Sequence, residues 1–464
     1  MNYPVKRNQE LTVKIEKVTF GGKGLARLND YVIFIKDTIP GDEARVRIVK
    51  RKPAYAEARL LQISKASPLR LDPPCPYFSW CGGCTWQNVS YREQLRFKSE
   101  HVTESLKHLA DLSQVNILEP IAADKIWAYR NKMEFSFSDR RWLLPSELKI
   151  DTIDRSYALG LHISGTFDKI LHIDNCLLQS KAANSVLRLT DAFCKQQQLL
   201  PYSLKTHEGY LRFLMIRESL YHNEIMVNLV TAQKRPKQLL PLAHLLMEEV
   251  PQVCSVINNI NSKKAQIAYG EEEILLAGKD HIEERLGSFK FKISANSFFQ
   301  TNTTQVLRLY KSVLEFSELK SEDIVWDLYS GTGTISIFLA SRAQYVYGFE
   351  LVESAVEDAV YNANYNNLNN IRFVSGDLLY NLRDFKYKPD IIVVDPPRSG
   401  LHPKVCDIIS SSPARRIIYV SCNPTTLARD VKLLHGSYQL VKVQPVDMFP
   451  HTYHIETVSQ LEKK

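Results

Sequence analysis

Apolar and polar residues alternate in short runs over the first 65 residues of the chain. The runs LTVKIEKVTF, YVIFIK, EARVRIVKRK and YAEARLLQI are separated by the turn-forming segments GGKG and IPGD. Alternation over a few residues is typical of strands with one buried face, and glycine and proline mark the turns between them. The pattern predicts a small β-barrel over residues 1–66.

A helical period replaces this alternation in the segment YREQLRFKSEHVTESLKHLA. Its apolar residues recur at the spacing of one helical face, at Leu95, Val102, Leu106 and Leu109. We therefore expect an amphipathic helix at about residues 91–110. From about residue 121 to residue 280, strands and helices alternate without a compact chemical motif.

The last part of the chain, residues 281–464, contains apolar strands that end in polar residues. IVWDLYSGTGTISIFLA is predicted to form a strand, a glycine turn and an apolar helix, and strands with polar ends recur in YVYGFEL, IRFVSGD, DIIVVDPPRSGL and RRIIYVSCNP. Ligands of open α/β sheets bind at the carboxyl ends of the strands. The pattern predicts an α/β domain with a doubly wound, Rossmann-like sheet and a ligand site at those ends.

Length and composition indicate a folded, multidomain protein. A chain of 464 residues is too long for one core and predicts about three domains, and 44% hydrophobic and 24% charged residues are ordinary values for globular proteins. We find no apolar run long enough to span a bilayer and no signal peptide, so we expect a cytoplasmic protein without a membrane partner. The eight cysteines are then expected to be reduced.

The positive charge of the chain is concentrated at its start. Residues 1–70 hold 15 Lys and Arg against 7 Asp and Glu, which accounts for the whole net charge of +8. Such a segment could merely be well solvated, but a basic barrel also offers cations to a phosphate backbone. We expect the predicted barrel to bind nucleic acid.

The glycine turn and the strand that follows it are typical of nucleotide binding. Gly331 and Gly333 let the backbone approach a ligand, and Glu350 ends the second strand, where it can accept hydrogen bonds from a ribose diol. This short motif would also suit NAD. The later strands favour a different cofactor. Their polar ends, at Asp377, at Asp395 with its Pro-Pro-Arg continuation and at Ser-Cys-Asn, are typical of a class I methyltransferase that uses S-adenosylmethionine (SAM).

Three cysteines lie within ten residues of one another in LDPPCPYFSWCGGCTWQ, at Cys75, Cys81 and Cys84. The prolines and glycines among them bend the backbone so that the sulfurs can converge on a metal. Zinc sites more often use two CxxC pairs, whereas three clustered cysteines and a distant fourth suit a [4Fe-4S] cluster. We assign Cys176 as the fourth ligand. Cys194 and Cys254 are expected to be core residues.

The residue after the DPP motif bears on which atom is methylated. An aromatic residue there would favour an exocyclic amine, but this chain has Arg398. Carbon 5 of uracil is a poor nucleophile until a thiolate adds to carbon 6, and a base must later remove the proton from carbon 5. Cys422 in SCNP fits the nucleophile, and Glu456 in HIETV fits the general base.

Together these motifs resemble those of a known family. GGKGLARLNDYVIFIKDTIPGDEARVRI resembles a TRAM domain, an OB-like RNA-binding barrel. The cysteine spacing, with YRNKMEFSF and GLHISGTFDKILHIDNC, resembles that of the iron-sulfur RNA 5-methyluridine methyltransferases, the RumA/RlmD type of the TrmA family. The resemblance covers nearly the whole chain and extends to FFQTN, DLYSGTG, DPPR, SCNP and HIETV.

The resemblance implies a function and a set of sites. It implies a monomeric SAM-dependent 23S rRNA (uracil-C5)-methyltransferase, with an iron-sulfur central domain over residues 67–280 and the helix at 91–110 packed on the catalytic domain. By motif position it implies cofactor-binding residues at Gln300, Tyr329, Glu350, Asp377 and Asp395. Ser330 stands where many relatives have cysteine, at a position without a catalytic role.

Each of these residues also has a structural alternative. Gln300 could cap a helix that begins near Thr301, Tyr329 could be a core residue, and Glu456 could belong to a surface ion pair. Three other functions compete: a radical-SAM methylthiotransferase with a TRAM domain, an inactive RNA-binding protein, and a methyltransferase acting on tRNA. The first lacks its usual C-x3-C-x2-C motif here, and the second conflicts with the presence of both Cys422 and Glu456.

Overall fold

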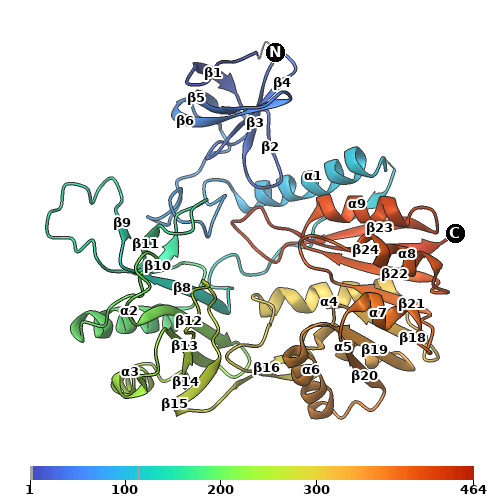
Figure 1. The fold of residues 1–464 in the computed structure, drawn as a ribbon. Coiled ribbons are helices and arrows are strands. Elements are labelled where there is room, and N and C mark those ends of the chain that lie inside the picture. Colours follow the sequence, from blue (N-terminus) through green and yellow to red (C-terminus); the bar gives the residue numbers. More distant parts are fainter. Residues whose placement is uncertain (1–3, 113) are drawn as a thin grey trace.

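The computed structural model of the chain describes residues 4–112 and 114–464. Its first strands form a strongly curved sheet at the top of Figure 1, in the order β1-β5-β6-β4-β3-β2. The inward positions of these strands are apolar, because the alternation in the sequence places every second side chain in one small core. The strands are β1 (Glu10–Lys14), β2 (Lys17–Val18), β3 (Gly24–Leu28), β4 (Tyr31–Ile35), β5 (Glu43–Arg51) and β6 (Tyr55–Lys65).

The central region is a mixed sheet with helices on one face, drawn mainly in green in Figure 1. Its strands run in the order β15-β14-β13-β12-β8-β10-β11-β9, and α2 and α3 contribute to the core on one side of it. The elements are β8 (Lys132–Ser138), β9 (Arg141–Trp142), β10 (Ala158–His162), β11 (Ile170–His172), α2 (Lys181–Gln196), β12 (Leu211–Ser219), β13 (Glu224–Thr231), η1 (Pro236–Gln238), α3 (Leu240–Glu249), β14 (Val253–Ile260) and β15 (Glu272–Gly278).

The last part of the chain forms a doubly wound sheet in the order β20-β19-β18-β21-β22-β24-β23-β7. The strands from β20 to β22 are parallel, and β24 runs antiparallel to β22. Strands β16 (Ile282–Leu286) and β17 (Phe289–Ile293) form a separate two-stranded sheet. The other elements are α4 (Thr303–Ser317), β18 (Ile324–Leu328), α5 (Thr334–Ala340), β19 (Tyr345–Glu350), α6 (Glu353–Tyr365), β20 (Ile371–Ser375), α7 (Leu378–Arg383), β21 (Ile391–Val394), α8 (Pro403–Ser411), β22 (Arg416–Ser421), α9 (Pro424–Leu434), β23 (Tyr438–Val446) and β24 (Glu456–Lys463). The prediction of a doubly wound α/β sheet is confirmed.

Two elements that precede the central region join this last sheet. Helix α1 (Tyr91–Leu109) packs on α9 and on β23, and β7 (Asn116–Ile117) extends the sheet beside β23. Val102 and Leu106 of α1 are buried in the same core as α8 and α9. The amphipathic face predicted from sequence is wrong at Leu109, which is 47% exposed, because the helix ends there.

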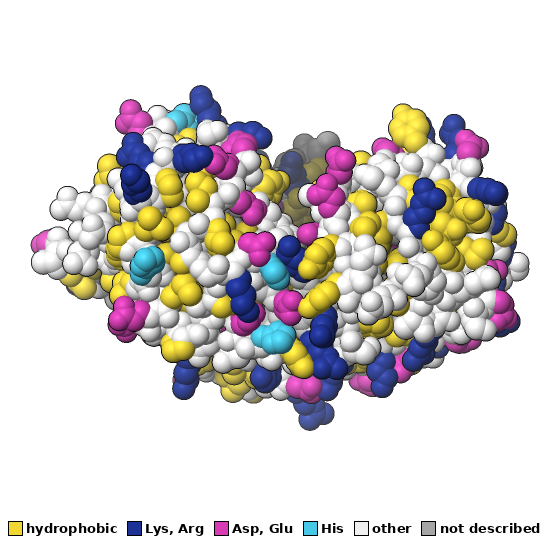
Figure 2. Space-filling view, turned by 90° about the horizontal axis from the view of Figure 1, so that it is seen from below, with side chains coloured by type: hydrophobic (Ala, Val, Ile, Leu, Met, Phe, Trp, Pro, Cys, Tyr) yellow, Lys and Arg dark blue, Asp and Glu magenta, His cyan; other side chains and the backbone are white. Residues whose placement is uncertain are grey.

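The surface far from the barrel carries both signs of charge. In the view from below, acidic and basic side chains are interspersed with apolar ones (Figure 2).

Among the described residues, no helix is both long and apolar enough to cross a membrane.

Candidate active site and cysteine cavity

Cys422 and Glu456 lie next to each other at one edge of the catalytic sheet. Strand β22 ends at Ser421 and β24 begins at Glu456, and the two strands run antiparallel with Ser421 opposite Thr457. The Thr457 hydroxyl donates a hydrogen bond of 3.2 Å to the carbonyl oxygen of Ser421. Cys422 and Glu456 are therefore the next residues on two neighbouring strands, and the fold brings them together.

Burial and neighbouring charges shift the pKa of both groups. Burial, and then the Asp395 carboxylate, raise the pKa of Glu456 well above its ordinary value. Burial, with smaller contributions from Glu456 and Asp395, raises the pKa of the Cys422 thiol to about 11. The cationic Arg398 lowers both pKa values and so favours the thiolate and the carboxylate. Glu456 is only 8% exposed, so it does not belong to a surface ion pair.

Arg398 is fixed through its backbone, whereas its side chain is available. Its carbonyl oxygen accepts hydrogen bonds from the Asn423 side chain at 3.1 Å and from the Thr426 hydroxyl at 3.4 Å, which ties the DPPR turn to the Cys422 turn. No described residue forms a hydrogen bond or an ion pair with the Arg398 guanidinium. A free cation beside a thiol and a carboxyl group can bind an anion or a developing oxyanion.

The turn after β18 has a left-handed backbone, which lets a ligand approach the main chain closely. Tyr329, Gly331 and Gly333 have positive φ angles of 66°, 55° and 78°. A Cβ atom on Gly333 would lie 2.7 Å from the Phe373 ring, so glycine is required there. The Tyr329 side chain packs partly buried against the core, and its left-handed backbone, uncommon for a non-glycine residue, directs the chain into the turn.

Glu350 connects this turn to the next strand end. One carboxylate oxygen accepts a hydrogen bond from the Gly331 N–H at 2.9 Å. The other accepts hydrogen bonds from the N–H groups of Leu351 at 2.8 Å and Val352 at 2.9 Å. The carboxylate is thus oriented at the end of β19, where a nucleoside ribose is held in folds of this kind.

The remaining predicted cofactor residues surround the same turn. Burial raises the pKa of Asp395, directly after β21, to about 7. Asp377 follows β20 and caps α7 by accepting a hydrogen bond from the Leu379 N–H at 2.7 Å. The segment around Gln300 is tied to the turn because the Thr332 hydroxyl donates a 3.2 Å hydrogen bond to the Phe298 carbonyl oxygen.

Gln300 does not cap the following helix. Helix α4 begins at Thr303, and its N-cap is Asn302, whose side chain accepts a hydrogen bond from the Gln305 N–H at 3.3 Å. The alternative of a helix cap at Gln300 is therefore wrong. The amide side chain of Gln300 has no hydrogen bond to a described residue.

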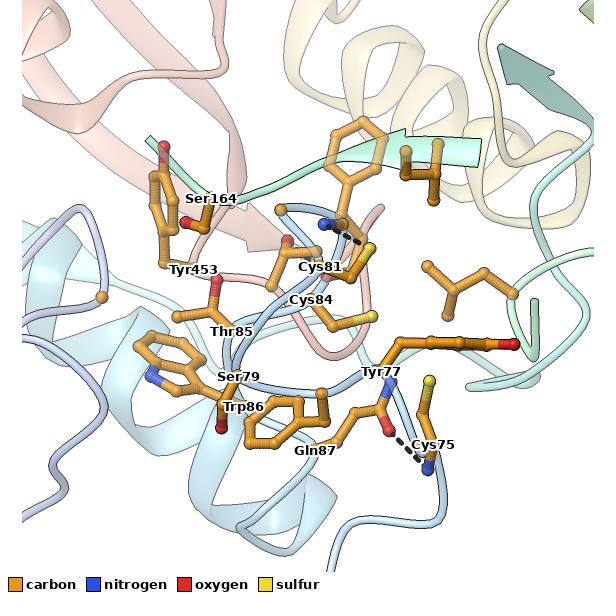
Figure 3. A pocket seen from close by; sticks show the side chains of 18 of the residues that line it. Cys75, Tyr77, Ser79, Cys81, Cys84, Thr85, Trp86, Gln87, Ser164 and Tyr453 are labelled. Carbon is orange, nitrogen blue, oxygen red and sulfur yellow. Dashed lines mark hydrogen bonds between the residues drawn. The ribbon is translucent and has the colours of Figure 1, made fainter. Parts of the chain in front are cut away.

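The four cysteines of the predicted cluster line one cavity of about 540 Å³. Cys75, Cys81 and Cys84 come from the loop between β6 and α1, and Cys176 comes from the loop after β11. Figure 3 shows the first three with Tyr77, Thr85 and Trp86 around the cavity. All four cysteines are free thiols.

The four thiols of this cavity are the ligands that the sequence predicts for an iron-sulfur cluster. Burial raises the pKa of each of the four thiols and, together with charges on neighbouring cysteines, brings the pKa values of Cys81 and Cys84 to about 12. The raised pKa values favour the neutral thiols, and several thiolates in one cavity would need a cation, such as a metal cluster, to be stable. The Gly83 N–H donates a 3.3 Å hydrogen bond to the Cys81 sulfur. Among residues 4–112 and 114–464, however, no three such side chains stand at the spacing of metal ligands.

Residues 447–455, which we call the catalytic loop, connect β23 to β24 and were not singled out from the sequence. Tyr453 and His454 of this loop line the cysteine cavity together with Arg398, so the cavity reaches from the cysteines to the side of Arg398. Burial, and then Arg398, lower the pKa of His454 to about 4, so its ring is neutral at pH 7. In the motif HIETV, the sequence predicted a role for Glu456 but none for His454.

Comparisons with known proteins bear on this geometry. The profile of the tRNA (Uracil-5-)-methyltransferase family matches residues 168–464, and the TRAM domain profile matches residues 4–61. The chain belongs to the TrmA family. It carries a TRAM domain at its start, so the predicted barrel is confirmed as a TRAM barrel.

Relatives in other organisms cover nearly the whole length of the chain. It is 44% identical to an uncharacterised RNA methyltransferase of Chlorobaculum tepidum over 91% of this chain and 90% of the relative. It is 39% identical to one of Bacteroides thetaiotaomicron over 95% of this chain and 99% of the relative. Among solved structures, the Pyrococcus abyssi tRNA (uracil-54, C5)-methyltransferase in complex with S-adenosyl-L-homocysteine matches with a TM-score of 0.75 and 30% identity, covering 97% of this chain and 99% of that one. The protein is a SAM-dependent RNA uracil-5 methyltransferase of this family.

Proposed function

We propose that the protein methylates carbon 5 of one uridine in 23S rRNA through a covalent adduct with Cys422. The observation that carries this proposal is the pairing of Cys422 with Glu456 on adjacent strand ends, beside the unpartnered Arg398. SAM supplies an electrophilic methyl group, and the turn at Tyr329–Gly333 with Glu350, Asp395 and Gln300 would hold it. A uracil ring bound between this turn and Cys422 would face the methyl group on one side and the thiol on the other.

Cys422 acts first. Its thiolate adds to carbon 6 of the uracil, the sulfur–carbon bond forms, and the π electrons move to oxygen 4 as an enolate. Arg398 favours this step because its cation stabilises both the thiolate and the developing negative charge. Carbon 5 can then accept the methyl group, and S-adenosylhomocysteine is the second product.

Glu456 acts last. After methyl transfer, carbon 5 carries both a methyl group and a proton, and the ring is still bonded to Cys422. The Glu456 carboxylate removes this proton, the double bond between carbons 5 and 6 forms again, and the Cys422 thiolate leaves. Arg398 favours the carboxylate form that this step requires, although burial and Asp395 oppose it.

Cys75, Cys81, Cys84 and Cys176 are proposed to hold a [4Fe-4S] cluster. Their shared cavity and their lack of disulfides support one common occupant. No group for electron delivery adjoins the cavity among the residues that line it. We therefore assign the cluster a structural role in the central domain, residues 67–280. As a separate expectation, the protein acts as a monomer.

The RNA substrate is tested by mapping 5-methyluridine in a strain that lacks the gene. Loss of one 5-methyluridine from 23S rRNA, with tRNA unchanged, is the expected result. The match to a tRNA methyltransferase of Pyrococcus abyssi favours tRNA as the second candidate. Loss of 5-methyluridine from tRNA alone would establish this alternative.

A further inference from the structure

The tip of the TRAM barrel packs directly on the catalytic loop. This tip, residues 19–23, is a tight turn between β2 and β3 in which the Gly22 N–H donates a 2.8 Å hydrogen bond to the Thr19 carbonyl oxygen. The Phe20 ring meets the Tyr453 ring edge to face, with centroids 5.5 Å apart. A Cβ atom on Gly22 would lie 2.4 Å from the Thr85 side chain and 3.5 Å from the Tyr453 ring. The approach is therefore too close for any residue but glycine.

Helix α1 holds the base of the same tip. The His101 ring lies 3.2 Å from the Val18 carbonyl oxygen through its Nε2 atom, and it also meets the Phe20 ring at 6.1 Å. Lys17 forms an ion pair with Glu104. Because α1 belongs to the catalytic core, the tip is anchored to that domain independently of RNA.

The catalytic loop depends on contacts from outside its own hairpin. The His451 carbonyl oxygen accepts hydrogen bonds from the N–H groups of Thr85 at 2.7 Å and Trp86 at 3.0 Å, and the His451 N–H donates to the Gln94 side chain at 2.7 Å. These contacts fix the first half of the loop. In its second half, the TRAM tip contacts Tyr453 through the Phe20 ring.

Tyr453 in turn positions a residue of the cavity wall. Its ring lies tilted against the His454 ring, with centroids 4.1 Å apart and an interplanar angle of 36°. Tyr453, His454, Gly22 and Arg398 line the same cavity. Phe20 therefore contacts Tyr453, and Tyr453 contacts His454. His454 lines the cavity together with Arg398 and lies two positions before Glu456 in the sequence.

We propose that the TRAM tip is a positioning element for the chemical step: Phe20 holds Tyr453, and Tyr453 holds His454 in the cavity wall that Arg398 also lines, where the target uridine enters. This inference rests on the proposed function. It assigns the barrel a second role, because a barrel that only bound phosphates would affect RNA affinity and leave the rate of the bound complex unchanged. A misplaced wall beside the reacting base slows the reaction even when RNA is saturating.

The test is the Phe20→Ala variant of the full chain, assayed by single-turnover methylation at saturating RNA and SAM. The expected result is a rate lowered about tenfold or more, with the Kd for RNA within about twofold of wild type. Phe20→Tyr keeps the ring and should restore the rate. The matched control is Phe34→Ala, which removes a ring of β4 that packs on Tyr55 at 5.5 Å and on no described ring of the catalytic loop, and it should keep the wild-type rate.

The outcomes separate the positioning role of the TRAM tip from the proposed function. A Phe20→Ala protein with a weaker RNA Kd and an unchanged saturating rate, or with neither changed, would overturn the positioning role. Hydrogen exchange of residues 451–454 gives a readout without substrate: exchange should become faster in Phe20→Ala and not in Phe34→Ala, and equal exchange in both overturns the inference. If the wild type forms no 5-methyluridine in either RNA, the proposed function fails, and this exchange comparison still decides the contact.

Discussion

Lys98 and Asp447 form an ion pair in which both side chains are fully buried. Lys98 Nζ lies 2.6 Å from Asp447 Oδ1 and also donates a 2.9 Å hydrogen bond to the Phe449 carbonyl oxygen. The Tyr91 hydroxyl donates to the other Asp447 oxygen at 2.9 Å. The pair joins α1 to the first residue of the catalytic loop, across 349 positions of sequence.

Removing one member of this pair should cost more stability than removing both. In Lys98→Met, the carboxylate of Asp447 stays buried without its cation, and we expect the free energy of unfolding to fall by about 3 kcal/mol or more. In Lys98→Met with Asp447→Asn, no buried charge remains, and part of the loss should be recovered. Thermal unfolding of both variants is the measurement, and equal losses would show that the ion pair does not govern stability here.

The cysteine cavity makes a prediction about metal content. Protein purified without oxygen should be brown and contain about four irons per chain. Cys84→Ser should lower the iron content because this side chain lines the cavity. Cys254→Ser, a half-buried cysteine outside the cavity, is the matched control and should keep the iron. Stoichiometric zinc in the anaerobic wild type would exclude the cluster.

The barrel makes a prediction about salt dependence. Arg45 and Arg59 lie on its exposed outer face without an ion pair to a described residue, whereas Arg27 is paired with Glu16. Arg45→Ala with Arg59→Ala should weaken RNA binding and lower the slope of log K against log salt by up to about 1.5, at roughly 0.7 per phosphate contact. Arg27→Ala should change the slope less, because its charge is already compensated. An unchanged slope in the double variant would place the phosphate contacts elsewhere.

The sequence predicts those parts of the site that are encoded locally. A strand, its polar end and the glycine turn lie within a dozen residues, so Gly331, Glu350 and Cys422 could be placed at the sheet edge before the structure was known. The catalytic loop could not be predicted, because its shape depends on α1 and the cysteine loop. Gln94 and Lys98 of α1 are fully buried although they are polar. Their partners, His451 and Asp447, lie more than 340 residues away and cannot be found from periodicity.

The Cys422 thiol should react faster as pH rises. Burial, with Glu456 and Asp395, raises its pKa to about 11, so little thiolate exists near neutral pH. Alkylation of Cys422 in the free protein, followed by mass spectrometry of its peptide, should accelerate about tenfold per pH unit between about pH 7 and 10, since only the thiolate is nucleophilic. Arg398→Gln removes the cation that lowers this pKa and should slow alkylation at a given pH. A rate independent of pH in this range would show that the thiol is already ionised.

Glu456→Gln should stop the reaction after methyl transfer. The amide keeps the shape of the carboxyl group but cannot take the proton from carbon 5, so the ring stays bonded to Cys422. Incubation of this variant with substrate RNA and SAM should give a protein–RNA band that survives a denaturing gel and contains methylated uracil. Cys422→Ala should give no band, alone or combined with Glu456→Gln, because the sulfur that forms the bond is absent. Methylated RNA released by Glu456→Gln at the wild-type rate would show that another group takes the proton, and a band that persisted without Cys422 would remove Cys422 as the nucleophile.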